Sequence, residues 1–413
     1  MLSSKHLFTS TFISFAVILT LSAQNSGKAY LEPAHEQGAE WETTKTNSNG
    51  RDPKDILRLY PDTEMIPRLS QYKWRPRAWK IPTRPQPAFV ALLFADLHSE
   101  SSELKRIMTF YNYYEEYFDA VLSAGDALHH WDLDYSFWKE AGASKVLPVL
   151  GNHEVFAAFH PERKVDEVAL KQWKSPSFSE KEAYERFYKP YLDETKFTDN
   201  PEGKCYWYKD FPDLNIRLFG MDSFHWREKV ILDNDSLARE YPDGEPTDNG
   251  EQQAWFRKAL EDARTKHLSV ICMDHCPYRK DFEAISCPFT SIYRPGECAM
   301  MHPEMILAVD EFIANGGDFV TWLCGHVHYD LFSIINAPHS RQLQIAVDKS
   351  TPTDGTQRKF KGTVSEDCFD IIAVDPNFGI LTLQRIGAEY DSFGRHIGTM
   401  VYDYRNKTII SHD

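Results

Sequence analysis

Short continuous apolar runs alternate with amphipathic stretches between residues 88 and 324. Runs of this length are typical of strands that are covered on both faces. The strands that they predict are AFVALLF (88–94), AVLSA (120–124), VLPVL (146–150), NIRLFGMD (215–222), LSVICMD (268–274) and DFVTWLC (318–324). Helical periodicity predicts helices at 100–118, 133–142, 250–265 and 303–317. Strands that alternate with helices favour an α/β fold.

The pattern differs outside this alternating series. After residue 330 the apolar segments follow one another without a convincing helix, which predicts antiparallel strands that form or complete a second sheet. These segments are YDLFSIINA, RQLQIAV, CFDIIAV, GILTLQRI and GTMVYDY. Residues 155–200 predict two charged, aromatic helices and no strand. Residues 24–87 are rich in turn residues and proline, so we expect an extension that wraps over a domain spanning 88–413, with Trp74 and Trp79 as anchors.

The N-terminus is typical of a secretory signal peptide. Lys5 and His6 precede an apolar stretch at 7–21, which the small residues Ser22 and Ala23 follow. A retained membrane anchor is the alternative, but the strongly apolar part is short beside the about 20 residues of a membrane span. We therefore expect cleavage near Ala23, a secreted or periplasmic protein, and no transmembrane segment in the mature chain.

Composition narrows the possible functions. A hydrophobic content of 42% is that of a packed globular protein, and a formal net charge of −15 argues against general nucleic-acid binding. Seven cysteines leave at least one thiol unpaired. Cys272 and Cys324 lie in apolar runs, where buried free thiols are expected. Cys287 and Cys298 share one loop region and can form a disulfide in an exported protein.

Potential metal ligands follow five of the predicted strands. They are Asp96 and His98, Asp126, Asn152, His275, and His326 with His328. The carboxyl ends of strands are where functional groups converge in an open α/β sheet, and the adjacent glycines permit tight turns. Each motif alone occurs by chance, and an H-x-H pair is more often a surface pair of histidines. Five such strand ends together indicate a metal site.

The order D-x-H, GD, GNHE, H and GH-x-H resembles that of the calcineurin-like metallophosphoesterase family. The motifs span residues 96–328, and the QQAWF helix start at 252–256 fits the same resemblance. The resemblance implies a four-layer α-β-β-α sandwich, in which helices flank two mixed β-sheets and a dinuclear metal site lies at the strand ends. That arrangement agrees with the strand-rich C-terminal region.

The resemblance also implies two divalent transition-metal ions (Mn, Fe or Zn). The ligands that it implies are Asp96, His98 and His328 for the first ion, Asn152, His275 and His326 for the second ion, and Asp126 as the bridge between them. Imidazole and carboxylate groups suit such ions. Two ions about 3.5–4 Å apart activate a water for attack on a phosphoryl group. His153 matches the family histidine that faces the phosphate, where it would stabilise the transition state or protonate the leaving group.

One position departs from related families. The phosphoprotein phosphatases place an aspartate three residues after the bridging aspartate, whereas this chain has His129 there, and Asp132 or Asp134 are the nearby substitutes. Purple acid phosphatases have an iron-binding tyrosine at that position and lack the histidine of the first motif. The presence of His98 and the absence of a tyrosine at 129 therefore argue against that subfamily.

Three further residues are candidates for substrate contacts. They are His129, Arg279 and Arg294. Arginine can hold a phosphate with two hydrogen bonds, but a solvated loop is the more common setting for any single arginine. A position on the rim of the pocket is likewise the more common setting for a loop histidine such as His129.

The function that these features favour is an exported phosphomonoesterase that acts on a small phosphorylated substrate. A phosphodiesterase acting on nucleotides, nucleic acid or phospholipid head groups would share the same metal core, so the core does not separate the two. A non-catalytic metal-binding scaffold is the third reading, and the presence of His153 speaks against it because a scaffold has no need of that imidazole. The sequence does not select among metals or oligomeric states.

Overall fold

The computed structural model describes the chain between residues 88 and 412, with gaps. The described ranges are 88–98, parts of 104–115, 118–127, 146–156, 174–176, 179–192, 195–224, 231–233, 250–278, 282–284, 301–328, 330–348, 350, 368–387 and 399–412. The signal segment, the N-terminal extension and the helix expected at 133–142 lie outside these residues. His129, Arg279 and Arg294 lie outside them as well.

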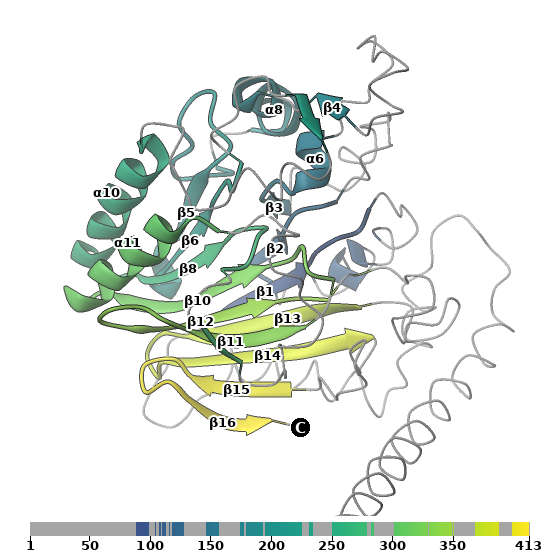
Figure 1. Cartoon of the computed structure of the whole chain (residues 1–413). Helices are drawn as coiled ribbons and strands as arrows, with labels where there is room; N and C mark the ends of the chain where they lie inside the picture. The colour runs from purple at the N-terminus through teal and green to yellow at the C-terminus, as the bar shows by residue number, and fades with distance from the viewer. Residues whose placement is uncertain are drawn as a thin grey trace, which may run out of the picture.

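Two mixed sheets form the centre of the fold (Figure 1). The first sheet has the strand order β16-β15-β14-β13-β1-β2-β3. Its parallel strands are β1 (Phe89–Phe94), β2 (Ala120–Ser123) and β3 (Val146–Pro148). Its antiparallel strands are β13 (Cys368–Asp375), β14 (Ile380–Gly387), β15 (Thr399–Asp403) and β16 (Thr408–His412). Strand β1, the first that the structure describes, thus pairs with β13 from the C-terminal part of the chain.

The second sheet has the strand order β5-β6-β8-β10-β12-β11-β9. Its parallel strands are β6 (Ile216–Gly220), β8 (Ser269–Met273), β10 (Asp318–Cys324) and β12 (Arg341–Ala346). Its antiparallel strands are β5 (Trp207–Phe211), β11 (Leu331–Asn336) and β9 (Phe282–Ala284). A small separate pair is made by β4 (Lys174–Pro176) and β7 (Ile231–Asp233).

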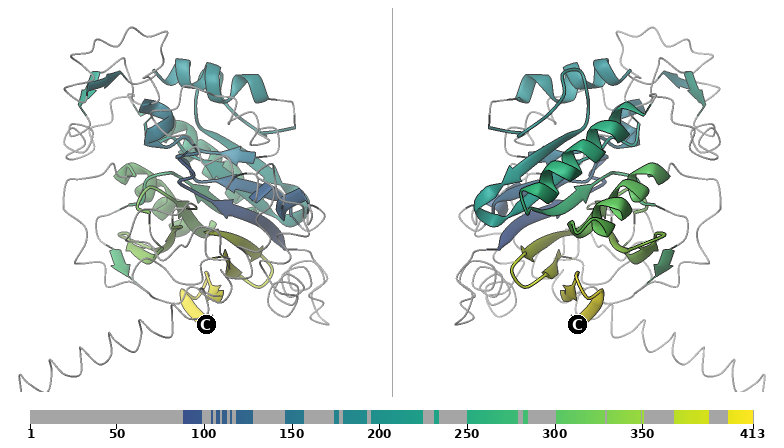
Figure 2. Two further views of the ribbon diagram at one scale, coloured as in Figure 1. Left: turned by 90° about the vertical axis from the view of Figure 1, so that its right-hand side faces the viewer. Right: turned by 90° about the vertical axis from the view of Figure 1, so that its left-hand side faces the viewer.

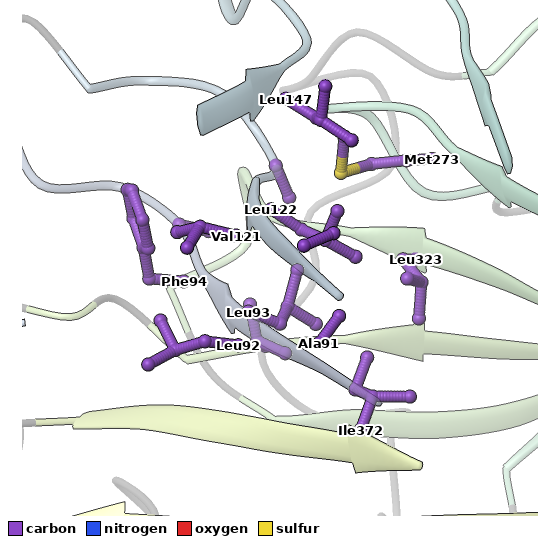
Figure 3. Close-up of a cluster of buried hydrophobic side chains, with 14 of the residues drawn as sticks. Ala91, Leu92, Leu93, Phe94, Val121, Leu122, Leu147, Met273, Leu323 and Ile372 are labelled. Carbon is purple, nitrogen blue, oxygen red and sulfur yellow. The ribbon is translucent and has the colours of Figure 1, made fainter. Parts of the chain in front are cut away.

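The main hydrophobic core joins the two sheets. Figure 3 shows Leu122 and Leu147 of the first sheet beside Met273 and Leu323 of the second, and all four side chains are buried. The strands on either side are covered on both faces, which is why their sequences read as continuous apolar runs instead of alternating ones. The burial of this apolar surface is the largest favourable contribution to the stability of such a fold.

Helices cover the outer faces of the sheets. In Figures 1 and 2, α10 (Glu251–Thr265) and α11 (Pro303–Ala314) lie side by side over the second sheet. The ring of Phe256 on α10 lies 6.3 Å from that of Trp322 on β10. On the other sheet, Phe110 belongs to the helical residues at 104–112, and its ring lies 5.1 Å from that of Phe369 on β13. These layers confirm the predicted arrangement of two mixed sheets flanked by helices.

Short elements complete the described chain. They are α6 (Asn152–Phe156), α8 (Glu180–Phe187) and the 3-10 helices η2 (Lys189–Tyr191) and η3 (Pro212–Leu214). Helix α8 begins with a capping box, in which the Ser179 side chain accepts from the Glu182 backbone while the Glu182 carboxylate accepts from the Ser179 backbone. Among the helices that the structure describes, none combines the length and the apolarity that a membrane crossing requires.

Two expectations about strands need correction. The sequence predicts no strand at 155–200, but β4 lies there, and its three residues are too few to leave a recognisable pattern. The sequence also predicts that the strands after residue 330 form or complete a single second sheet. They are divided instead: β11 and β12 continue the sheet of β10, whereas β13 to β16 extend the sheet of β1.

The cysteines that the structure describes are all buried, and they are Cys205, Cys272, Cys276, Cys324 and Cys368. Cys272 and Cys324 are free thiols. The expectation of free thiols in the apolar strands is therefore confirmed for Cys272 and Cys324. Cys287 and Cys298 lie outside the described residues, so their pairing stays a prediction.

Candidate metal centre

The five ligand-bearing strand ends meet at one place between the two sheets. Strands β1, β2 and β3 contribute from the first sheet, and β8 and β10 contribute from the second. The side chains that could hold a metal form two groups, which are Asp96, His98, Asp126 and His328, and Asp126, His275 and His326. Within each group, one donor atom from each residue lies within 4.8 Å of the others. Asp126 belongs to both groups, as a residue that bridges two ions must.

In the first group, the imidazoles of His98 and His328 lie close to the Asp96 and Asp126 carboxylates. Nε2 of His98 lies 3.6 Å from Oδ2 of Asp126 and 3.9 Å from Oδ1 of Asp96. Nε2 of His328 lies 3.5 Å from Oδ1 of Asp96. The donors of this group therefore converge from three different loops.

The second group is tighter and includes an amide. Nε2 of His275 lies 3.3 Å from Oδ2 of Asp126, 3.1 Å from Oδ1 of Asn152 and 3.1 Å from Nδ1 of His326. Nδ1 of His326 lies 2.9 Å from the same Asn152 oxygen. Two imidazole nitrogens, a carboxylate oxygen and an amide oxygen thus face a common point. This donor chemistry fits a divalent transition-metal ion.

Hydrogen bonds fix the direction of the ligands before any ion binds. Nδ1 of His275 donates to the carbonyl oxygen of Ala124 at 2.8 Å, which leaves Nε2 as the ring nitrogen that faces the other candidate ligands. The backbone N–H of His153 donates to Oδ1 of Asp126 at 2.8 Å, which leaves Oδ2 facing the histidines. The backbone N–H of His326 donates to the Asp96 carboxylate.

The ligand loops have an unusual backbone. Five of the ligands adopt left-handed conformations, with φ values of 54° for Asp96, 48° for His98, 51° for Asp126, 71° for His326 and 58° for His328. Residues other than glycine rarely occupy this region, and they stay there only when the surrounding structure holds them. Such clustering is characteristic of functional sites.

Two glycines let these loops approach each other closely. A Cβ atom on Gly151 would lie 2.0 Å from Oδ1 of Asp126, and a Cβ atom on Gly125 would lie 2.5 Å from Nδ1 of His275. Gly125 also has a φ of 92°, which a residue with a side chain rarely adopts. The glycines of the GD and GNHE motifs are thus required by packing against the ligands themselves.

The electrostatics match what metal ligands need. Burial would raise the pKa of Asp126, but the charges of His275 and His153 and hydrogen bonds from His275 and His98 hold it well below its usual range. Burial likewise opposes ionisation of Asp96, yet the hydrogen bond and charge of His328 lower its pKa. Burial, followed by the charge of His275, lowers the pKa of His326 to about 3. Both carboxylates are therefore ionised and His326 is neutral at neutral pH.

His275 differs from His326 in its protonation. Burial would lower the pKa of His275, but the charge and hydrogen bond of Asp126 raise it to about 10. A cation that binds at Nε2 of His275 must therefore displace a proton, so metal binding and proton release are coupled at this position.

His153 lies beside the candidate ligands His98 and Asp126. Its ring stacks on that of His98 with centroids 4.3 Å apart, and its Nε2 lies 3.7 Å from Oδ2 of Asp126. The His153 side chain is 15% exposed, whereas that of Asp126 is only 1% exposed. The imidazole therefore lies against the candidate metal ligands and keeps some contact with solvent.

Glu154 has a role that the sequence did not indicate. Oε2 of this fully buried residue accepts hydrogen bonds from the backbone N–H groups of Asp126, at 3.0 Å, and Gly151, at 2.7 Å. It therefore ties the GD loop to the GNHE loop. Its position at the end of the GNHE motif was visible in the sequence, but its buried backbone partners were not.

Comparison with known proteins agrees with this geometry. The sequence profile of the calcineurin-like phosphoesterase family matches residues 89–330. The chain belongs to the calcineurin-like phosphoesterase family. It is therefore a metal-dependent phosphoesterase, a hydrolase of phosphorylated substrates, and its family implies divalent ions at a dinuclear site.

Two solved structures are similar to this chain at low identity. A dimetal phosphatase from Danio rerio is 12% identical with a TM-score of 0.48, over 77% of this chain and 100% of the other. A structure of PhoD is also 12% identical with a TM-score of 0.48, over 79% of this chain and 72% of the other. Comparison with curated protein sequences gave no match.

Proposed function

We propose that this phosphoesterase is an exported phosphomonoesterase with two divalent transition-metal ions. The ligands proposed for the first ion are Asp96, His98 and His328, those for the second are Asn152, His275 and His326, and Asp126 bridges them. When bound, the ions supply Lewis acidity that activates water and stabilises negative charge on the phosphoryl group.

The charge balance of the ligands supports a preference for monoesters. Asp96 and Asp126 are the two carboxylates among the proposed ligands, and the other donors are neutral imidazoles and one amide. Two divalent cations held by these groups leave a surplus of positive charge. A phosphate monoester is dianionic near neutral pH and matches that surplus better than a monoanionic diester does.

The observation that carries the catalytic proposal is the position of His153. Its Nε2 lies 3.7 Å from Oδ2 of Asp126 and its side chain is partly exposed. A phosphoryl group held by the metal centre would therefore lie within reach of this imidazole. Nε2–H can donate to a phosphoryl oxygen or transfer its proton to the leaving alkoxide, which is a poor leaving group unless it is protonated.

Support for export comes from the N-terminal sequence. A basic start, an apolar stretch at 7–21 and small residues at 22 and 23 are the parts of a cleavable signal. We propose cleavage near Ala23 and a secreted or periplasmic location. Expression of the full chain in a secreting host, followed by mass spectrometry of its N-terminus, tests this. A cytoplasmic protein that begins at Met1 would contradict it.

Hydrolysis assays test the substrate class. The mature protein is stripped with a chelator, reloaded with Mn²⁺, Zn²⁺ or Fe²⁺, and given p-nitrophenyl phosphate or bis-p-nitrophenyl phosphate. We expect faster turnover of the monoester, no turnover by the stripped protein, and normal turnover by the surface control Lys189→Ala. Turnover of the diester alone would overturn the monoester preference, and no turnover with any metal would favour a non-catalytic scaffold.

A further inference from the structure

A buried arginine of the first sheet binds an aspartate that directly precedes a strand of the second sheet. Arg385 lies on β14 of the first sheet and is fully buried. Its Nε donates to Oδ1 of Asp370 at 2.8 Å, and Asp370 is its cross-strand partner on β13. Its Nη1 donates to Oδ2 of Asp330 at 3.1 Å, and its Nη2 donates to Oδ1 of the same residue. Asp330 directly precedes β11 of the second sheet and follows the ligand His328 by two residues.

This cluster is not explained by stability alone. One guanidinium and two carboxylates are all withdrawn from water, and a buried ion cluster of this kind is often no more stabilising than apolar residues of similar volume. What a guanidinium adds is direction, because its planar fork can hold a carboxylate in one orientation through two parallel hydrogen bonds. Arg385 holds Asp330 in that way.

The loop that ends at Asp330 needs to be held at both ends. On its upstream side, the backbone N–H of Gly325 donates to the carbonyl oxygen of His275 at 3.0 Å. Between the two ends, His326 and His328 have φ values of 71° and 58°. Residues in this strained region keep it only when their surroundings impose it. The fork of Arg385 supplies the downstream anchor.

The same aspartate is linked to a second ligand loop through Asp348 and Ser350. Oδ1 of Asp330 also accepts from the backbone N–H of Asp348 at 3.2 Å. Two residues later, the backbone N–H of Ser350 donates to the carbonyl oxygen of Ala95 at 3.1 Å, and the Ser350 hydroxyl accepts from the backbone N–H of Ala95 at 3.4 Å. Ala95 directly precedes the ligand Asp96. The anchored residues therefore flank two loops that supply ligands of the proposed first ion.

We propose that the Asp330–Arg385 ion pair is a positioning device for the first metal ion. Arg385 fixes the loop that carries His328 and, through Asp348 and Ser350, supports the loop that carries Asp96. Arg385 lies beyond the residues 89–330 that match the family profile, whereas its partner Asp330 is the last residue of that match. The inference rests on the metal ligands of the proposed function and not on its preference for monoesters.

Two matched variants of the full-length mature protein test this proposal. Asp330→Asn and Asp370→Asn each remove one buried carboxylate from the same guanidinium, but only residue 330 lies beside a metal ligand. Titration calorimetry with Mn²⁺ or Zn²⁺ and elemental analysis after dialysis give the affinity and number of bound ions. We expect Asp330→Asn to bind one ion like the parent and the other at least about tenfold more weakly, and Asp370→Asn to bind both ions like the parent.

One further variant identifies the ion that is lost, and another replaces Asp330→Asn if that variant does not fold. The ion lost in Asp330→Asn should be the one lost in His328→Ala, so the two variants should have the same residual stoichiometry and the same Mn²⁺ electron paramagnetic resonance spectrum. If Asp330→Asn does not fold, Arg385→Lys decides the question, because it keeps the positive charge and loses the fork. We then expect selective weakening of the same ion.

Several outcomes would overturn the proposal. Equal losses of metal affinity in Asp330→Asn and Asp370→Asn would show general destabilisation, and unchanged affinity in a folded Asp330→Asn or Arg385→Lys would remove the positioning role. A parent protein that binds two ions but hydrolyses no phosphate ester would instead contradict the proposed function, and it would leave the role of Arg385 intact.

Discussion

The backbone N–H of His153 donates a 2.8 Å hydrogen bond to Oδ1 of Asp126, while the imidazole Nε2 of His153 lies 3.7 Å from Oδ2 of the same carboxylate. The backbone of His153 thus orients the proposed bridging ligand, and its side chain lies close to the same carboxylate and is partly exposed. These two contributions can be separated, because a substitution removes the imidazole and keeps the N–H group.

For this reason, His153→Ala is expected to bind both ions like the parent and to lose activity. The loss of a proton donor or transition-state contact should lower kcat by about 10²- to 10⁴-fold. Elemental analysis and hydrolysis of an alkyl phosphate, whose alkoxide leaving group needs a proton, measure both effects on the same preparation. Turnover like that of the parent would remove His153 from the mechanism, and a loss of metal would show that the side chain is needed for binding.

His326→Ala is expected to lose metal as well as activity. Nδ1 of His326 lies within 3.1 Å of both Asn152 Oδ1 and His275 Nε2, so its removal opens the second group of ligands. We expect a loss of at least one ion per chain by elemental analysis and turnover close to background. His339→Ala is the control, because His339 is exposed and its backbone, not its side chain, donates to Asp310. Two ions retained in His326→Ala would refute this ligand assignment.

Gly151→Ala should damage the metal centre without changing any ligand. A Cβ atom there would lie 2.0 Å from Oδ1 of Asp126, so the carboxylate or the loop must move. We expect metal affinity to fall by about 10- to 100-fold, as is common when the support of a ligand is lost. Gly203→Ala is the control, because a Cβ atom there meets nothing within 4 Å. Its φ of 79° should cost about 1 kcal/mol of stability but no metal. Equal metal affinity in the two variants would contradict the packing argument.

The turn between β15 and β16 should give the protein a pH-dependent stability. Burial lowers the pKa of Lys407 to about 8, below the ordinary value of 10.5. The unfolded chain therefore binds this proton more readily, so stability should rise with pH from about 8 to about 10.5. Because Lys407 is partly exposed, we expect Lys407→Met to raise the free energy of unfolding by only about 1 kcal/mol at pH 7. The variant should also lack the increase in stability between about pH 8 and about pH 10.5. Denaturant unfolding at several pH values measures it, and a slope unchanged from the parent would contradict it.

The sequence predicted the central strands well because their physical setting leaves a clear pattern. Strands β1, β8 and β10 are buried on both faces, and a continuous apolar run is the direct result. Strand β5 was missed because it is an edge strand with the sequence WYKDF, in which four of the five residues are only partly buried. Strand β16 was missed for a similar reason, since its exposed Ile409 and Ile410 do not alternate with polar residues.

The grouping of the candidate ligands was predictable because each lies directly after a strand in a short motif. The motifs GD and GNHE are short and contiguous, so Asp126 and Asn152 can be located from a few residues of the sequence. The ion pair of Asp330 and Arg385 could not be found in that way. The two residues are 55 positions apart in the sequence. They meet because the sheet that contains β14 packs against the sheet that contains β11.

The division of the ligands between two sheets has a consequence for how the protein matures. Asp96 and Asp126 follow strands of the first sheet, whereas His275 and His328 follow strands of the second. Strand β1 also takes its neighbour β13 from residues 368–375, far along the chain. The set of donors is therefore complete only after residues 96 to 328 have been synthesised and the two sheets have packed together. Capture of both ions becomes a late event in biogenesis, and the metal content of a preparation should report the fraction of molecules that have completed folding.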